Sequence, residues 1–280
     1  MGNANIALGM RRTATKYLSA VVLVAAVGVA SGGLAGATTK RVNLSAAYRA
    51  TIAAPSVKET FSEALVANGT HLTLNGSGVS DSRGNGSFIL QEAGESIDTV
   101  VDNGTEYLKV PAMSLPALQV TTPWVSLNLD TLAKAKLGQT YQQLASYGQQ
   151  GPAQSLAILK GESSAGVKLV GTSTLFGVKT TEYRTTLDRN KIASASGKAL
   201  APAIEKLQSQ YHYSSLPLEI WLDGQQRVRR LVEMVKATTP PVSATITVNI
   251  EAFDVPVNAT PPPAGQVTDV TAKLTGSSNG

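Results

Sequence analysis

The chain has 280 residues, no cysteine, only 15% charged residues and a formal net charge of +5 at pH 7. Without a thiol it holds no disulfide, thiolate zinc site, iron–sulfur cluster or cysteine nucleophile. Three of its bases, Arg11, Arg12 and Lys16, lie in a segment without acids, so the rest of the chain is nearly neutral. Such a chain, without a basic groove or interleaved aromatics, lacks the charge that binds phosphates, which excludes nucleic acid as a partner.

The first 37 residues have the order of a secretory signal peptide. The three bases precede an apolar run from Tyr17 to Ala30, and small residues follow up to Ala37. This order predicts export of the protein and cleavage of the signal after Ala37. The alternative is an uncleaved membrane anchor, because the stretch from Tyr17 to Thr39 carries no charge and approaches the roughly 20 residues that span a bilayer.

A short helix and an antiparallel meander are expected next. Residues 44–53 are rich in alanine, and Pro55 ends this helix. From Val57 onwards apolar residues fall on alternate positions; residues 57–65 form the first expected strand, although their Glu and Ala would also suit a helix. Asn-Gly pairs separate the following runs and predict tight turns at Asn68, Asn75, Asn85 and Asn103.

The next part of the chain mixes strands and helices. Residues 124–129 predict a strand, residues 130–160 predict short helices divided by glycines, and residues 167–187 predict further strands. An amphipathic helix is expected within residues 191–213, where apolar residues share one helical face.

The clearest local pattern is a β-hairpin over residues 216–235. Four apolar residues alternate before Asp223-Gly224, a pair that tolerates positive φ, and apolar residues return after it. A last long strand covers residues 242–255. The Pro-, Ser- and Gly-rich end beyond it predicts a largely unstructured tail.

This order of elements predicts an α+β fold in which an antiparallel sheet packs helices on one face. The expected organisation is a signal peptide at 1–37, a single α+β domain at 38–257 and a flexible tail at 258–280. No repeat with a period of roughly 20 to 50 residues is present, which excludes solenoids and propellers.

Several segments, taken together, resemble the actinobacterial LppX/LprG-type lipoproteins. They are WVSLNLD at 124–130, the stretch from Gly171 to Asp188, LEIWLDGQQRVRRL at 218–231 and FDVPV at 253–257. The resemblance covers most of residues 44–272 and rests on the order of these motifs.

The resemblance implies a half-barrel comparable with LolA-type carriers: a single strongly curved antiparallel sheet wrapped around helices and an apolar cavity. It also implies a lipid-binding domain that carries lipid or lipoglycan acyl chains in the cell envelope, with no catalytic motif. The lipidated cysteine of the family's lipobox is replaced by Ala37, so we expect export without a lipid anchor.

Alternating apolar strand residues are the candidates for lining such a cavity. They are Leu72, Leu74, Phe88, Leu90, Leu108, Val110, Leu218 and Ile220. The alternative is that helices cover the same residues and make them a solid core, because pockets and cores use the same residue types. Two functions follow: a lipid-binding or lipid-carrier protein of the envelope, or a non-enzymatic structural or interaction module.

No catalytic residue, metal site or cofactor is predicted. The chain has two histidines, His71 and His212, and no serine in a Gly-x-Ser-x-Gly turn. The acidic residues lack the ligand order of an EF-hand. We therefore expect a monomeric protein that is not an enzyme.

One basic cluster follows the hairpin turn. Arg227, Arg229 and Arg230, together with His212, are candidates for the cavity entrance, where they would contact anionic headgroups at a membrane surface. The alternative for the three arginines is an ordinary solvated strand face.

Overall fold

The computed structural model describes residues 42–67, 70–92, 94–134, 156, 159, 166–188, 215–238 and 241–275. The expected signal peptide, the amphipathic helix within 191–213, most of the expected helices within 130–160, and His212 lie outside these residues.

The described chain forms one sheet of twelve strands. The strands are β1 (Ser56–Ala67), β2 (Thr70–Asp81), β3 (Gly86–Glu92), β4 (Glu95–Asp102), β5 (Thr105–Lys109), β6 (Trp124–Asn128), β7 (Lys168–Leu175), β8 (Val178–Asp188), β9 (Ser215–Leu222), β10 (Val228–Thr238), β11 (Pro241–Phe253) and β12 (Val267–Asp269).

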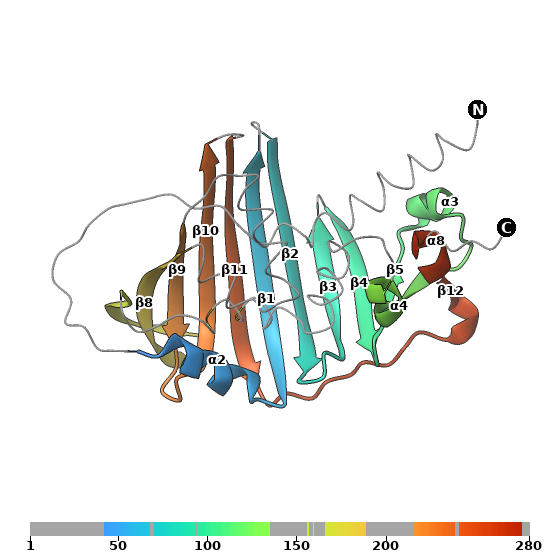
Figure 1. Cartoon of the computed structure of the whole chain (residues 1–280). Helices are drawn as coiled ribbons and strands as arrows, with labels where there is room; N and C mark the ends of the chain where they lie inside the picture. The colour runs from blue at the N-terminus through green and yellow to red at the C-terminus, as the bar shows by residue number, and fades with distance from the viewer. Residues whose placement is uncertain are drawn as a thin grey trace.

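Two meanders meet in the middle of this sheet (Figure 1). Strands β1 to β6 follow one another on one side, and strands β7 to β11 follow one another on the other. The two halves are joined where β1 pairs antiparallel with β11. Only β12, at the edge beside β6, runs parallel to its neighbour in the described sheet. The expected antiparallel sheet is therefore confirmed, while its strong curvature stays a prediction.

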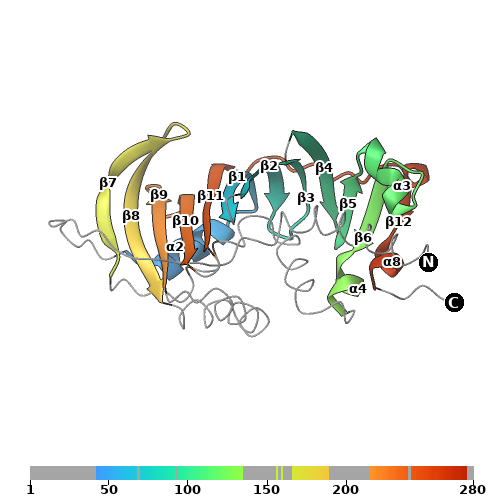
Figure 2. The ribbon, with the colours of Figure 1, turned by 90° about the horizontal axis from the view of Figure 1, so that it is seen from above.

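Short helices accompany the sheet. They are α2 (Leu44–Ile52), η1 (Ala112–Ser114), α3 (Leu115–Leu118), α4 (Leu129–Lys134), η3 (Ala264–Gln266) and α8 (Thr271–Thr275). Helices α2, α4 and α8 lie on the same side of the sheet (Figure 2). We call this side the helix face and the opposite side the outer face.

Helix α2 confirms the first expected element and is fixed at both ends. Asn43 caps it, since its side-chain oxygen accepts a hydrogen bond from the Ala46 N–H at 2.9 Å. Near the other end the buried Thr51 hydroxyl donates to the Ala47 carbonyl at 2.7 Å and accepts from the Val228 N–H at 2.8 Å. This second bond ties α2 to the start of β10.

The Asn-Gly pairs do not all form turns. Asn103 and Gly104, with φ of 47° and 76°, connect β4 to β5 as a two-residue hairpin turn requires. Asn75-Gly76 lies inside β2, so that turn prediction is wrong. Gly76 is needed there because a Cβ atom would overlap the ring of Phe61 on β1.

The expected hairpin is present, but its turn differs from the prediction. Gln226, with φ of 62°, is the left-handed residue of the turn. Asp223 organises the turn, since its side chain accepts hydrogen bonds from the N–H groups of Gln225 and Arg227, each at 2.9 Å. The turn is thus longer than the two-residue turn that Asp223-Gly224 suggests.

Part of the expected tail is ordered. Strand β12 pairs with β6, and α8 follows it. Val270, between the two elements, and Thr271, the first residue of α8, are buried. The Thr271 hydroxyl also accepts a hydrogen bond from the Asn128 N–H at 2.9 Å. The prediction of an unstructured tail is wrong for this stretch, because it covers apolar side chains at the β6 edge.

The buried apolar residues form two clusters, one in each half of the sheet. The first contains residues of α2, β1 and β8 to β11, together with Val167 just before β7 and the fully buried Leu156 and Leu159. The second contains Val101, Val120, Val125, Leu127, Leu129 and Val270 from β4, β6, α4 and the neighbouring loops. Both halves of the sheet are thus anchored by apolar packing on the helix face.

Candidate functional site

The strand register places the predicted lining residues on one face. Residues directly opposite each other on neighbouring strands point to the same side of a sheet. Leu74 pairs with Glu63, Glu63 with Ile246, Ile246 with Glu233, and Glu233 with Leu218. The same counting across β3, β4 and β5 brings Phe88, Leu90 and Leu108 to this side, which is the helix face.

These residues differ in how far they are covered. Leu74, Leu218 and Ile220 are buried, and the last two belong to the first cluster. Leu72, Phe88, Leu90, Leu108 and Val110 are half-buried. The predicted lining residues of β9 are therefore part of the packed core, whereas those of β3 are more exposed to solvent.

A set of half-buried apolar residues lies between the two clusters. We call Phe61 of β1, Phe88 and Leu90 of β3 and Ile97 of β4 the central panel. In the part of the chain that the structure describes, none of the four belongs to either cluster. The central panel is thus the apolar part of the described helix face that neither cluster includes.

Glycines shape the floor of the central panel. A Cβ atom at Gly76 would overlap the Phe61 ring, and one at Gly78 would overlap the Phe88 ring and the Ser87 carbonyl. The rings of Phe61 and Phe88 therefore occupy the space that side chains at Gly76 and Gly78 would otherwise fill. Two aromatic rings of the central panel thus pack directly against the backbone of β2.

Three buried glutamates lie on the helix face beside the central panel. Glu59, Glu63 and Glu233 are 0%, 4% and 3% exposed. Glu59 accepts a hydrogen bond from the Ser80 hydroxyl at 3.2 Å. Both carboxyl oxygens of Glu63 are buried without a hydrogen-bond partner among the described residues.

Burial changes the protonation of these acids. Desolvation raises the pKa of Glu63 from its ordinary value of 4.5 to about 7. Desolvation, together with the charge of Glu63, raises the pKa of Glu233 to about 8. Below about pH 7 both acids are therefore mostly protonated and neutral, as their apolar surroundings favour.

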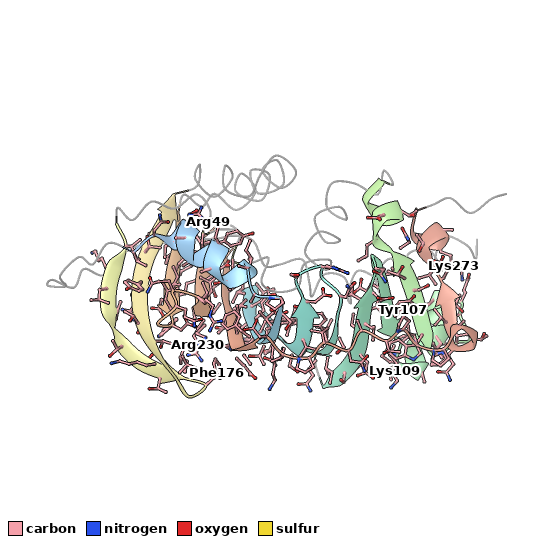
Figure 3. All side chains as sticks on the ribbon, turned by 90° about the horizontal axis from the view of Figure 1, so that it is seen from below. Arg49, Tyr107, Lys109, Phe176, Arg230 and Lys273 are labelled. Atoms are coloured by element: carbon pink, nitrogen blue, oxygen red, sulfur yellow. The ribbon has the colours of Figure 1, made fainter. Side chains whose placement is uncertain are left out.

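The outer face has a different chemistry. Arg184 forms ion pairs with Glu182 and Glu219, at 3.2 and 2.9 Å. Arg230 donates to the side chain of Asn249 at 2.7 Å. Figure 3 shows Arg230, Phe176 and Lys109 on the side of the sheet away from Arg49 of α2. The outer face thus carries ion pairs and polar contacts, together with the exposed apolar side chains of Ile89 and Phe176.

The predicted entrance arginines make contacts within the protein. Arg227 and Arg229 donate to the same Asp223 oxygen, at 3.1 and 3.2 Å, and their guanidinium groups lie 3.9 and 4.6 Å from the centre of the Phe253 ring. Arg229 is buried, whereas Arg230 points to the outer face. The structure therefore separates Arg230 from the other two, and a headgroup role for the cluster stays a prediction.

The sequence analysis did not identify the buried glutamates. A signal was available for two of them, because Glu59 and Glu63 share alternate positions with Val57, Phe61 and Leu65 in β1. Apolar residues at those positions mark the buried face of the strand, so acids between them have to be buried too.

Other candidates for chemistry do not assemble into a site. His71 is exposed, and Asp98 forms an ion pair with Lys109 at 3.0 Å. Within the described ranges no group of three or more metal-ligating side chains comes together. Among the same residues, no helix has the length and apolar character needed to cross a membrane.

Comparison with known proteins gives structural matches only. No protein-family profile and no curated protein matches the sequence. The crystal structure of lipoprotein LppX from Mycobacterium tuberculosis matches with a TM-score of 0.48 and 15% identity, over 78% of this chain and 98% of that one. LprF from Mycobacterium bovis matches with a TM-score of 0.49 and 14% identity, over 82% and 100%.

A third solved structure comes from another group of bacteria. A LolA superfamily protein from Nitrosomonas europaea matches with a TM-score of 0.30 and 9% identity, over 79% of this chain and 96% of that one. This cysteine-free chain is thus structurally similar to the LppX and LprF lipoproteins and to the LolA superfamily.

Proposed function

We propose that the protein is an exported, non-enzymatic lipid-binding protein that holds acyl chains against the helix face of its sheet. The observation that carries this proposal is the central panel. Its four large apolar side chains are half-buried and belong to neither packed cluster, and two of them are aromatic rings that lie over glycines of β2. Acyl chains suit such a surface because they need apolar area and no directional partner.

The resemblance of the sequence to LppX/LprG-type lipoproteins implies the same class of ligand. On this proposal the protein shields a lipid or lipoglycan while it is outside a bilayer, in the cell envelope or beyond it. The absence of cysteine means that a thioether-linked lipid anchor has no attachment point, so the carrier is expected to move without one.

A second function is favoured by a separate observation. Leu156 and Leu159 are fully buried in the first cluster, so protein side chains cover at least part of the helix face there. If the rest of the face were filled in the same way, the protein would be a structural or interaction module of the envelope with a solid core.

Two neighbouring substitutions on β3 test the proposal. Leu90 belongs to the central panel, whereas Ile89, the next residue, points to the outer face and is 44% exposed. Binding of a fluorescent acyl probe to delipidated protein is measured for the wild type, Leu90→Gln and Ile89→Gln.

We expect Leu90→Gln to weaken probe binding about tenfold or more, because a buried leucine contributes about 1.5–3 kcal/mol. Ile89→Gln should bind as the wild type does. Equal affinities for both variants would contradict the assignment of the central panel. A delipidated wild type that binds no acyl probe, and that carries no lipid when purified natively, would favour the solid-core module.

A further inference from the structure

Two acidic side chains face each other across one apolar residue on the helix face. Glu63 of β1 and Glu233 of β10 both pair with Ile246 of the intervening β11. Two strand spacings separate their Cα atoms by about 9.5 Å. Beyond them the row continues with Leu74 and Leu218, both buried, so the two acids interrupt an otherwise apolar line.

Burying two carboxyl groups destabilises the folded protein unless a hydrogen-bond partner binds them. A buried polar group without a partner loses its hydration and gains nothing in return, at a cost of about 1–3 kcal/mol. Glu59, on the same strand, accepts a hydrogen bond from the Ser80 hydroxyl through one oxygen, whereas the described residues provide no partner for either oxygen of Glu63. The unpartnered oxygens of Glu63 point to a hydrogen-bond donor that the ligand supplies.

The chemistry of the pair selects the kind of donor. We propose that Glu63 and Glu233 bind a hydroxyl group of an amphiphilic lipid whose apolar part lies on the central panel. A hydroxyl both donates and accepts, and so matches a carboxyl pair that is largely protonated. An ammonium group would require the pair to ionise in apolar surroundings, where no described lysine or arginine forms an ion pair with Glu63. This inference rests on the proposed lipid-binding function and adds the ligand class.

The test compares three amphiphiles of equal chain length. Dodecanol, dodecyl methyl ether and dodecylammonium compete with a fluorescent acyl probe on the delipidated full chain at pH 6. The ether accepts a hydrogen bond but cannot donate one, so the ratio of the ether and alcohol affinities isolates the donated hydrogen bond. We expect the wild type to bind the alcohol about tenfold more tightly than the ether.

Two variants assign this preference to the pair. Glu63→Leu replaces the carboxyl group with an apolar side chain of similar size. The variant should bind the alcohol and the ether with about equal affinity, because the hydrogen-bonding group is gone. The retained ether affinity shows that the variant is folded. Glu219→Leu removes an acid from the outer face, where Glu219 pairs with Arg184, and should leave the preference unchanged.

The outcomes separate this inference from the proposed function. Equal binding of alcohol and ether by the wild type, or an unchanged preference in Glu63→Leu, overturns the hydroxyl site and leaves acyl binding intact. If the wild type binds dodecylammonium more tightly than dodecanol, and Glu63→Leu does not, the hydroxyl site is wrong and the pair is a cation site. If none of the three amphiphiles displaces the probe, or no probe binds, the lipid-binding function itself fails.

Discussion

The substitution Glu63→Gln tests the energetic cost of the buried acids most directly. Glutamine has the shape of a protonated glutamate but cannot ionise. Because burial raises the pKa of Glu63 from 4.5 to about 7, ionising this side chain in the folded protein costs about 3 kcal/mol more than in the unfolded chain. The variant should therefore be more stable than the wild type wherever the wild-type acid is forced to ionise.

The direction of the pH dependence follows from proton binding. Between pH 4.5 and about 7 the folded state holds a proton on Glu63 that the unfolded state has lost, and for Glu233 this window extends to about pH 8. The contribution of these two acids to wild-type stability is thus fully present below pH 4.5 and is lost as the pH rises through their raised pKa values. Glu59, another acid on this face, accepts a hydrogen bond from Ser80 and is present in both proteins.

Urea unfolding at pH 5 and pH 8 measures the effect. We expect Glu63→Gln to match the wild type within about 1 kcal/mol at pH 5 and to exceed it by about 3 kcal/mol at pH 8. Glu219→Gln, on the outer face, should not produce this increase. An identical stability difference at both pH values would show that the Glu63 carboxyl is solvated, and would refute the reasoning.

Three further predictions, one of them with a control variant, test the fold. Gly86→Ala should lower the unfolding free energy by about 2 kcal/mol, because its Cβ would overlap a backbone carbonyl of β2, whereas Gly171→Ala has open space and should change it little; chemical denaturation compares the two. Thr51→Val should cost about 1–3 kcal/mol, measured in the same way, because it leaves the Val228 N–H without its partner. Asp223→Asn should lower the thermal midpoint at pH 7 and much less at pH 3, and an equal loss at both values would contradict the role of its charge.

The last prediction depends on the ionisation of Asp223. Burial alone would raise the pKa of this carboxyl, but hydrogen bonds from Arg227 and Gln225 and the charge of Arg227 outweigh burial and lower it. A lowered pKa stabilises the folded state above the ordinary value of 3.8, and this stabilisation is lost as the pH falls below it.

The strands were predictable because their pattern is local. Alternation of apolar residues in β9 and β11 marks both the strand and the face that it buries, and the Asn103-Gly104 turn follows from backbone geometry. A local sequence pattern cannot predict secondary structure where a residue distant in the sequence determines it. Gly76 lies in a strand because Phe61 of β1 occupies the space above it, and no window around Asn75-Gly76 contains that information.

The candidate site was predictable only in its apolar part. Alternation identified Phe88 and Leu90, which the register does bring to the helix face. The burial of Glu63 was missed because charged strand residues are usually solvated, and burial depends on which strands lie on either side. The ordered stretch from β12 to α8 was missed for a similar reason, since its few apolar residues matter only beside β6.

The join between β1 and β11 has a consequence for how the protein matures. Each meander can assemble from neighbouring segments, but the central pair brings together residues separated by almost the whole domain. Contacts of this kind form slowly, and until they form, two long strands expose unpaired backbone that attracts other chains. Until β11 pairs with β1 the sheet therefore stays in two separate halves, and the unpaired edges of these two strands have to be protected from aggregation.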